Sequence, residues 1–186
     1  MQPLEGDWND ARNVVVVAYA CGHCGNHTAS DKGLTHSHRN VGLRICTYCK
    51  RPTFFDIDES RMPGPLIGES VEHLSADLTK LYDEVRRAST VSAYTLMALG
   101  CRKILMHVAV DLGAKEGDTF KAYVNFIYDN HHVPANAKDW VEKIREMGNQ
   151  PNHELFTTSE SGAKQLLDFV SMLLKLVYEY PKRAKP

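Results

Sequence analysis

The chain has 186 residues, of which 43% are hydrophobic, and a formal net charge of −1. A chain of this length can bury one ordinary core plus a small extra module, and it contains no apolar run long enough to span a membrane. The near-zero charge excludes a global field that collects polyanions, so any nucleic-acid contact must depend on local basic clusters.

The first residues, Met1-Gln2-Pro3-Leu4-Glu5, contain neither the basic segment nor the apolar segment of a signal peptide. The cysteines are grouped in pairs rather than scattered as a disulfide framework, which is typical of a reducing compartment. We therefore expect a soluble, cytoplasmic protein with no membrane partner.

Four of the five cysteines form two Cys-x-x-Cys pairs, Cys21/Cys24 and Cys46/Cys49. Two thiolates three positions apart on a tight turn reach one face of a tetrahedral metal, and a second pair completes a closed four-sulfur shell that suits zinc. A β-branched run at residues 14–17 leads into the first pair. The sequence therefore predicts a small β zinc ribbon that holds one structural Zn²⁺.

The glycine after the first pair, Gly25, stands where a knuckle turn favours positive φ. A disulfide-exchange motif is an alternative interpretation of Cys-Gly-His-Cys, but no βαβ pattern surrounds it. Four histidines crowd the same region, and we expect them in solvated loops, with a mixed Cys/His site as the minor alternative: His23, His27, His36 and His38. Cys101 lies on an apolar helical stripe and is expected in the core.

Residues 58–68 contain Pro63-Gly64-Pro65, which neither continues a strand nor starts a long helix, and the periodicity becomes helical after them. We expect a ribbon with an N-terminal extension at residues 1–58, a linker at 59–69 and a helical domain at 70–186.

Apolar side chains in the second half follow helical spacing. One stripe runs from Val71 to Val85, and the next runs from Val91 to Leu112 and stops at Gly113, as at a C′ glycine. Shorter stripes occupy residues 120–127, 137–144 and 166–177. Because the connections are short, we expect an up-down bundle. The expected fold class is mainly α, an up-down helical bundle preceded by the small β ribbon.

The end of the fourth stripe carries a candidate phosphate site. Gly148 can end the helix in the left-handed conformation, and Pro151 prevents an ordinary continuation. The turn is therefore expected to bring Arg145, Asn149 and His153 to one corner, where a cation, an amide and an imidazole suit a phosphate.

Three features resemble the bacterial domain-of-unknown-function family four-one-four-five: Arg102-Lys103, the Ile-Arg-Glu-Met-Gly-Asn run at 144–149, and His153 four residues after Asn149. The resemblance covers roughly residues 66 to 180. That family is placed in the HEPN superfamily of helical bundles, many of which dimerise and cut or bind RNA. The resemblance therefore implies a HEPN-like bundle in which Arg102, Lys103 and Arg145 bind nucleic acid.

HEPN ribonucleases use an Arg, a polar residue and a His a few positions on. Here Gly148 stands beside Asn149 where active members have Arg, and Arg145 lies a turn earlier. His153, Arg145 and Asn149 are thus the candidate catalytic residues of a degraded site, because a His without its correctly placed cation loses transition-state electrostatics. We expect poor catalysis or none.

Three functions follow from these observations. The favoured one is a nucleic-acid-associated binding module that takes RNA or single-stranded DNA, in a bacterial or phage defence or conflict system. The alternatives are an active metal-independent HEPN ribonuclease and a protein-interaction adaptor whose partner docks on the ribbon. We also expect a homodimer, because Leu96, Met97 and Ile104 lie outside the main stripe of the second helix and need cover.

Overall fold

The computed structural model describes residues 2–38, 41–148 and 157–184. The chain forms two compact units, one of Met1–Ile67 with Ser89–Ser92 and one of Gly68–Ala88 with Ala93–Pro186. Within the described ranges, no helix combines the length and the apolar character that a membrane crossing requires.

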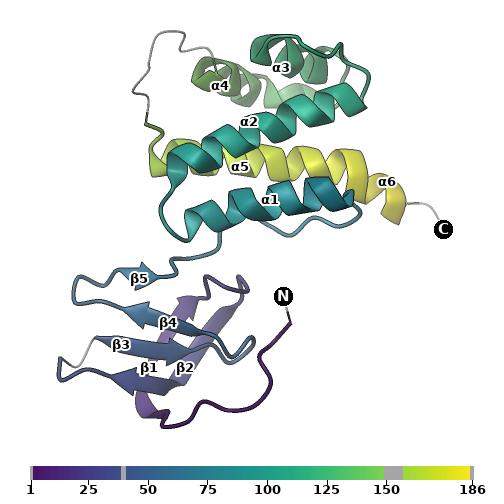
Figure 1. The fold of residues 1–186 in the computed structure, drawn as a ribbon. Helices are drawn as coiled ribbons and strands as arrows, with labels where there is room; N and C mark the ends of the chain where they lie inside the picture. The colour runs from purple at the N-terminus through teal and green to yellow at the C-terminus, as the bar shows by residue number, and fades with distance from the viewer. Residues whose placement is uncertain (1, 39–40, 149–156, 185–186) are drawn as a thin grey trace. The chain divides into compact units, whose positions relative to one another are not determined.

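The first unit is a five-stranded antiparallel sheet in which each strand pairs with the next one along the chain (Figure 1). Its strands are β1 (Arg12–Ala20), β2 (His27–Thr35), β3 (Gly42–Ile45), β4 (Pro52–Phe55) and β5 (Arg61–Met62). The last of these lies inside the segment that the sequence analysis assigns to a linker.

Strand β2 is almost entirely polar, and Leu34 is its one large apolar residue. Its side chains therefore give no strand pattern. The strand forms because its backbone pairs on both sides: Tyr19 of β1 lies opposite Thr28, and Leu34 lies opposite Leu43 of β3. The side chains of β2 favour neither a strand nor a loop, so hydrogen bonding of its backbone to the neighbouring strands determines that it is a strand.

In its described residues, the second unit contains five helices of ten or more residues: α1 (Ala76–Ser89), α2 (Tyr94–Asp111), α3 (Phe120–Asp129), α4 (Lys138–Gly148) and α5 (Glu160–Leu174). A short 3₁₀ turn, η1 (Ala135–Ala137), precedes α4, and a π-helical turn, η2 (Lys175–Glu179), joins α5 to α6 (Tyr180–Arg183). The expected end of α2 is confirmed, because Gly113 has a φ of 104° and its N–H donates to Val110 O at 2.9 Å.

The predicted apolar stripes of α2 to α5 form the core of this unit. Side chains spaced along these stripes are almost fully buried, among them Cys101, Leu105, Val124, Ile144 and Val170. The expectation that Met97 and Ile104 need cover from a second copy was wrong, since both are 0% exposed within this unit. Leu96 is 66% exposed.

The first predicted helix begins later than the sequence indicates. Val71 and Leu74 precede α1, because the segment before it is held by the C-terminal helices. Glu69 forms an ion pair with Lys175, and the Glu72 N–H donates to the buried Glu179 carboxylate at 2.9 Å. These side-chain contacts fix the segment where the apolar spacing alone predicts a helix.

The expected fold class, a mainly α up-down bundle with a small ribbon, was wrong. The N-terminal sheet takes up residues 12–62 as a layer of its own, so the chain is a mixed α and β protein. The helices also depart from up-down order, because α2 and α5 run parallel. Thr158 N–H bonds to Thr95 Oγ1 where both helices begin, and Tyr178 Oη donates to Asp111 Oδ2 at 2.6 Å beyond their other ends.

A buried polar contact ties α1 to α5. The Tyr82 hydroxyl donates to Glu69 O at 2.7 Å and lies 2.6 Å from Ser171 Oγ, which in turn donates to Leu167 O at 2.8 Å. Burial raises the pKa of Tyr82, so the hydroxyl stays protonated and remains a donor.

Tyr82→Phe should destabilise the helical unit by about 1 kcal/mol, because it removes the buried hydroxyl that donates to Glu69 O and contacts the buried Ser171 Oγ. Urea denaturation followed by circular dichroism at helical wavelengths measures the change. The matched control is Tyr180→Phe, since Tyr180 is exposed. Equal stability of the two variants would contradict the role of the Tyr82 hydroxyl.

Candidate metal centre

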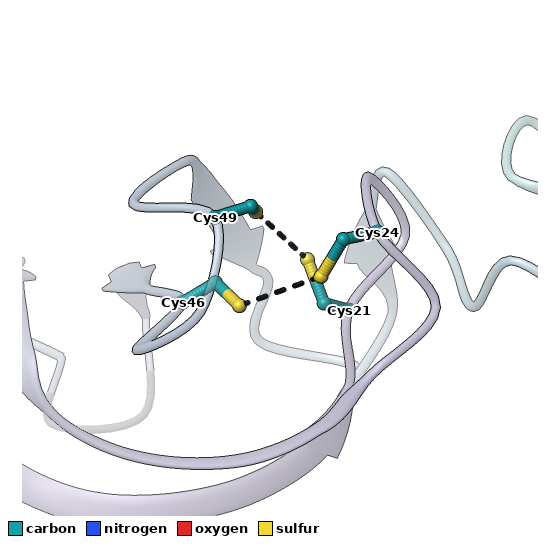
Figure 2. Close-up of side chains that lie close together, drawn as sticks. All are labelled: Cys21, Cys24, Cys46 and Cys49. Carbon is teal, nitrogen blue, oxygen red and sulfur yellow. Dashed lines mark hydrogen bonds between the residues drawn. The ribbon is translucent and has the colours of Figure 1, made fainter. Parts of the chain in front are cut away.

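The first cysteine pair lies on a knuckle between β1 and β2. The Gly25 N–H donates to Cys21 O at 2.8 Å, and the Cys21 N–H donates to Asn26 O at 2.9 Å. Gly25 has a φ of 76°, as the sequence predicts for this position. The turn aims the Cys21 and Cys24 side chains to one side (Figure 2).

The second knuckle, between β3 and β4, repeats this geometry. The Lys50 N–H donates to Cys46 O at 3.0 Å, and the Cys46 N–H donates to Arg51 O at 3.0 Å. Lys50 takes the place of Gly25 and has a φ of 60°. A non-glycine residue in the left-handed region costs about 1 kcal/mol, so Lys50 destabilises this turn locally by about that amount.

The four sulfur atoms converge between the two knuckles (Figure 2). All four lie within 4.8 Å of one another, with Cys21 Sγ 3.7 Å from Cys49 Sγ and Cys24 Sγ 3.8 Å from Cys46 Sγ. A tetrahedral metal with bonds of about 2.3 Å to sulfur places its ligands about 3.8 Å apart. These separations fit a four-thiolate metal site and are far too long for disulfide bonds.

The protein environment favours ionised sulfur at Cys24 more than at Cys21 or Cys49. Burial raises the pKa of Cys21 and Cys49. Burial also opposes ionisation of Cys24, but hydrogen bonds from the Asn26 N–H and the neighbouring thiols outweigh it and lower its pKa. A bound cation would stabilise the buried thiolates against the cost of desolvation, because metal binding displaces the thiol protons.

An apolar wall closes the inner side of the site. Tyr19 is buried beside the cysteines, and its ring meets Phe55 edge to face at 5.2 Å. The Tyr19 hydroxyl donates to Arg44 O at 3.2 Å, and burial raises its pKa to about 12. The buried Arg44 guanidinium lies 6.0 Å from the centre of the Phe55 ring. This packing shields the sulfur atoms from water.

Gly22 is a structural requirement that the sequence analysis misses. A Cβ at this position would lie 2.1 Å from Gly64 O and 2.9 Å from the Pro63 side chain. The knuckle therefore packs directly against the backbone of the Pro63-Gly64-Pro65 segment. A glycine between a cysteine and a histidine carries no signal of such an approach, because the contact is with residues far along the chain.

The histidines near the knuckles do not join the cysteine cluster, which among the described residues contains only the four cysteines. His27, His36 and His38 are exposed, as expected. His23 differs from the expectation, since its Nε2 lies 3.0 Å from Pro52 O and its side chain is half-buried.

An N-terminal arm, residues 2–8, lies on the second knuckle, and the sequence does not predict it. The Leu4 N–H donates to Cys49 O at 3.1 Å, and the Trp8 indole N–H donates to Lys50 O at 2.6 Å. The Arg51 guanidinium donates to Gln2 O at 2.9 Å. The arm carries no periodic pattern, and an isolated tryptophan is its only sequence signal.

The predicted phosphate corner is described only in part. Arg102 lies on α2 with its guanidinium carbon 4.5 Å from the Phe120 ring centre, and burial lowers its pKa. Lys103 is exposed on the same helix. Arg145 is half-buried in the last turn of α4, and its Nε has no hydrogen-bond partner among the described residues.

The other two members of the corner, Asn149 and His153, lie outside the described residues, so the corner stays a prediction.

Cys101 is confirmed as a core residue. It is completely buried, and burial raises the pKa of its thiol to about 12, which is unsuited to a nucleophile.

Purified protein should contain one metal ion per chain, and Cys46→Ser should lose it together with the fold of the sheet. A structural metal supplies folding free energy on the order of 10 kcal/mol, far more than a small sheet gains from its own core. Metal analysis measures the metal content, and NMR spectra report whether the ribbon is folded. Cys101→Ser is the control that should keep the metal. A fully folded sheet in metal-free Cys46→Ser would contradict the role of the metal.

Comparison with known proteins assigns the second unit to a family. A family model described as Domain of unknown function (DUF4145) matches residues 83–186, more than half of the chain. The match begins inside α1 and leaves the metal-binding sheet outside it. No curated protein and no solved structure matches the chain. The chain belongs to the DUF4145 family, and a sheet with four clustered cysteines that could hold a metal ion precedes the matched region.

Proposed function

We propose that the protein is a nucleic-acid-associated binding module whose metal-held ribbon contacts the phosphate backbone. The observation that carries this proposal is a separation of charge. Residues 12–51 contain one acidic residue, Asp31, whereas the whole chain has a net charge of −1. The same segment has six basic residues: Arg12, Lys32, Arg39, Arg44, Lys50 and Arg51. The resulting charge of about +5 falls to about +3 when a doubly negative zinc–tetrathiolate centre is included.

Several of these cations are exposed on a rigid support. Arg12, Lys32 and Lys50 are exposed, and Lys50 belongs to the second knuckle, whose backbone is fixed by its turn hydrogen bonds and by a bound metal. On a rigid turn, binding a phosphate requires little further ordering of the backbone. Binding by such cations releases counterions and therefore weakens with salt.

The metal in this proposal is zinc. Four thiolates fill all four tetrahedral positions, which suits a structural Zn²⁺ and leaves no position for catalysis. Iron also accepts four cysteine thiolates. Metal analysis of protein purified without added metal separates the two, because zinc gives a colourless protein and ferric iron a coloured one. Iron in place of zinc would contradict this part of the proposal.

The helical unit supplies the finer part of the proposal, which is membership of the HEPN superfamily and assembly as a homodimer in the cytoplasm. The family match at residues 83–186 contains Arg102, Lys103 and Arg145, which supports a phosphate-binding role. The exposed Leu96 and Leu99 on α2 support a contact with a second copy. RNA cleavage is a weaker proposal, since it depends on Asn149 and His153.

A second candidate function, a protein-interaction adaptor, is favoured by one observation on the sheet. Four large apolar residues lie opposite one another across neighbouring strands: Leu34, Leu43, Phe54 and Met62. Leu34, Phe54 and Met62 are exposed. A row of apolar side chains of this kind suits a protein partner.

Lys50→Gly should weaken binding of single-stranded RNA or DNA and lower the salt dependence of binding. The substitution removes one positive charge, so the slope of log K against log salt should fall by about 0.7 for a lost phosphate contact. It also relieves the left-handed backbone at this position, so weaker binding will not reflect unfolding. Fluorescence anisotropy of a labelled oligonucleotide at several salt concentrations measures the slope.

The matched control is Lys80→Ala, which removes an exposed lysine from α1 of the helical unit. Its affinity and slope should equal those of the wild type. If the wild-type protein binds no oligonucleotide even at low salt, the nucleic-acid proposal falls and the adaptor becomes the better conclusion.

A further inference from the structure

The second knuckle exposes an aromatic ring at its tip. Tyr48 is 56% exposed and stands between Thr47 and the metal ligand Cys49. Among the described residues, no hydrogen bond or ring contact involves the Tyr48 side chain. The Tyr48 ring is therefore free to contact a ligand, and its flat face suits stacking.

The first knuckle provides an internal comparison. Its third position, equivalent to Tyr48, is His23, and that ring is half-buried against Pro52 O. The two knuckles share the same turn hydrogen bonds, so the turn itself does not force the third residue outward. The exposure of Tyr48 is therefore a property of that side chain rather than of the knuckle geometry.

A second exposed aromatic residue contacts the same knuckle, which also carries a cation. The Trp8 indole donates to Lys50 O, which anchors an exposed tryptophan to the same knuckle. Lys50, two residues after Tyr48, is itself exposed. The arm that carries Trp8 also brings the acidic Glu5 and Asp7, which offset the positive charge at this end of the sheet. Stacking therefore adds to this surface an attraction that does not depend on its charge.

We propose that the second knuckle binds single-stranded nucleic acid by stacking an unpaired base on Tyr48, with Lys50 facing the adjoining phosphate and Trp8 offering a second platform. This inference rests on the proposed function and names its ligand class. Unpaired bases expose their faces, whereas in a duplex both faces are covered by neighbouring base pairs. A stacking surface therefore selects single strands. It binds strands of different base sequence, because every base has a π-face.

The test compares Tyr48→Ala, Tyr48→Phe and wild-type protein, each checked for bound metal, with labelled oligouridine and with the same strand annealed to its complement. Tyr48→Ala should weaken single-strand binding about tenfold, as expected for loss of one stacked base. Tyr48→Phe should bind as the wild type, because the phenyl ring keeps the stacking face. Tyr180→Ala, which removes an exposed tyrosine from α6, is the matched control and should not change affinity.

A strand that contains 2-aminopurine gives an independent readout. Its fluorescence should be quenched on binding to wild-type protein, and the quenching should be lost with Tyr48→Ala. Unchanged affinity and quenching in Tyr48→Ala, while Lys50→Gly still weakens binding, would overturn the stacking inference and leave the proposed function standing. Tighter binding of the duplex than of the single strand would also overturn it. Absence of any binding by the wild type would remove the proposed function itself.

Discussion

The ribbon is organised around one constraint, the convergence of four cysteine sulfurs within 4.8 Å of one another. The sulfur separations of 3.7 and 3.8 Å each join one knuckle to the other, so a metal bound there would link the β1–β2 turn to the β3–β4 turn. Metal coordination is much stronger than the packing available to a sheet whose second strand is polar. The positions of Tyr48 and Lys50 follow from this link, because both lie within the second knuckle.

The helical unit obeys a different constraint, which is the satisfaction of polar groups inside an apolar core. Parallel packing of α2 and α5 buries their stripes, and the segment before α1 is held by the buried Tyr82 hydroxyl and by the Glu179 carboxylate. Glu179 also accepts from Arg183 at 3.1 Å, so its charge is paired. Buried charges persist only when they are paired and hydrogen-bonded. A π-helical turn ends at Glu179 and places it for these contacts.

The proposed function draws on the surface of the ribbon more than on the family-matched unit. The first 51 residues contain six basic residues against four acidic ones, an exposed tyrosine on the second knuckle and an anchored tryptophan. In the helical unit, Arg102 lies over Phe120, and its guanidinium is thus partly committed to packing. In that proposal a bound metal would give the ribbon the rigidity that recognition of a flexible strand requires.

The sequence by itself determined the four-cysteine cluster, the left-handed Gly25, the buried stripes of α2 to α5 and the stop of α2 at Gly113. Each of these depends on contacts or dihedral angles within a few residues, which a local pattern reports. Only the tertiary structure decided that β2 is a strand, that α2 and α5 run parallel, that Gly22 approaches Gly64 and that the N-terminal arm lies on the second knuckle. Those features join residues far apart along the chain, and their energy comes from partners that no local pattern identifies.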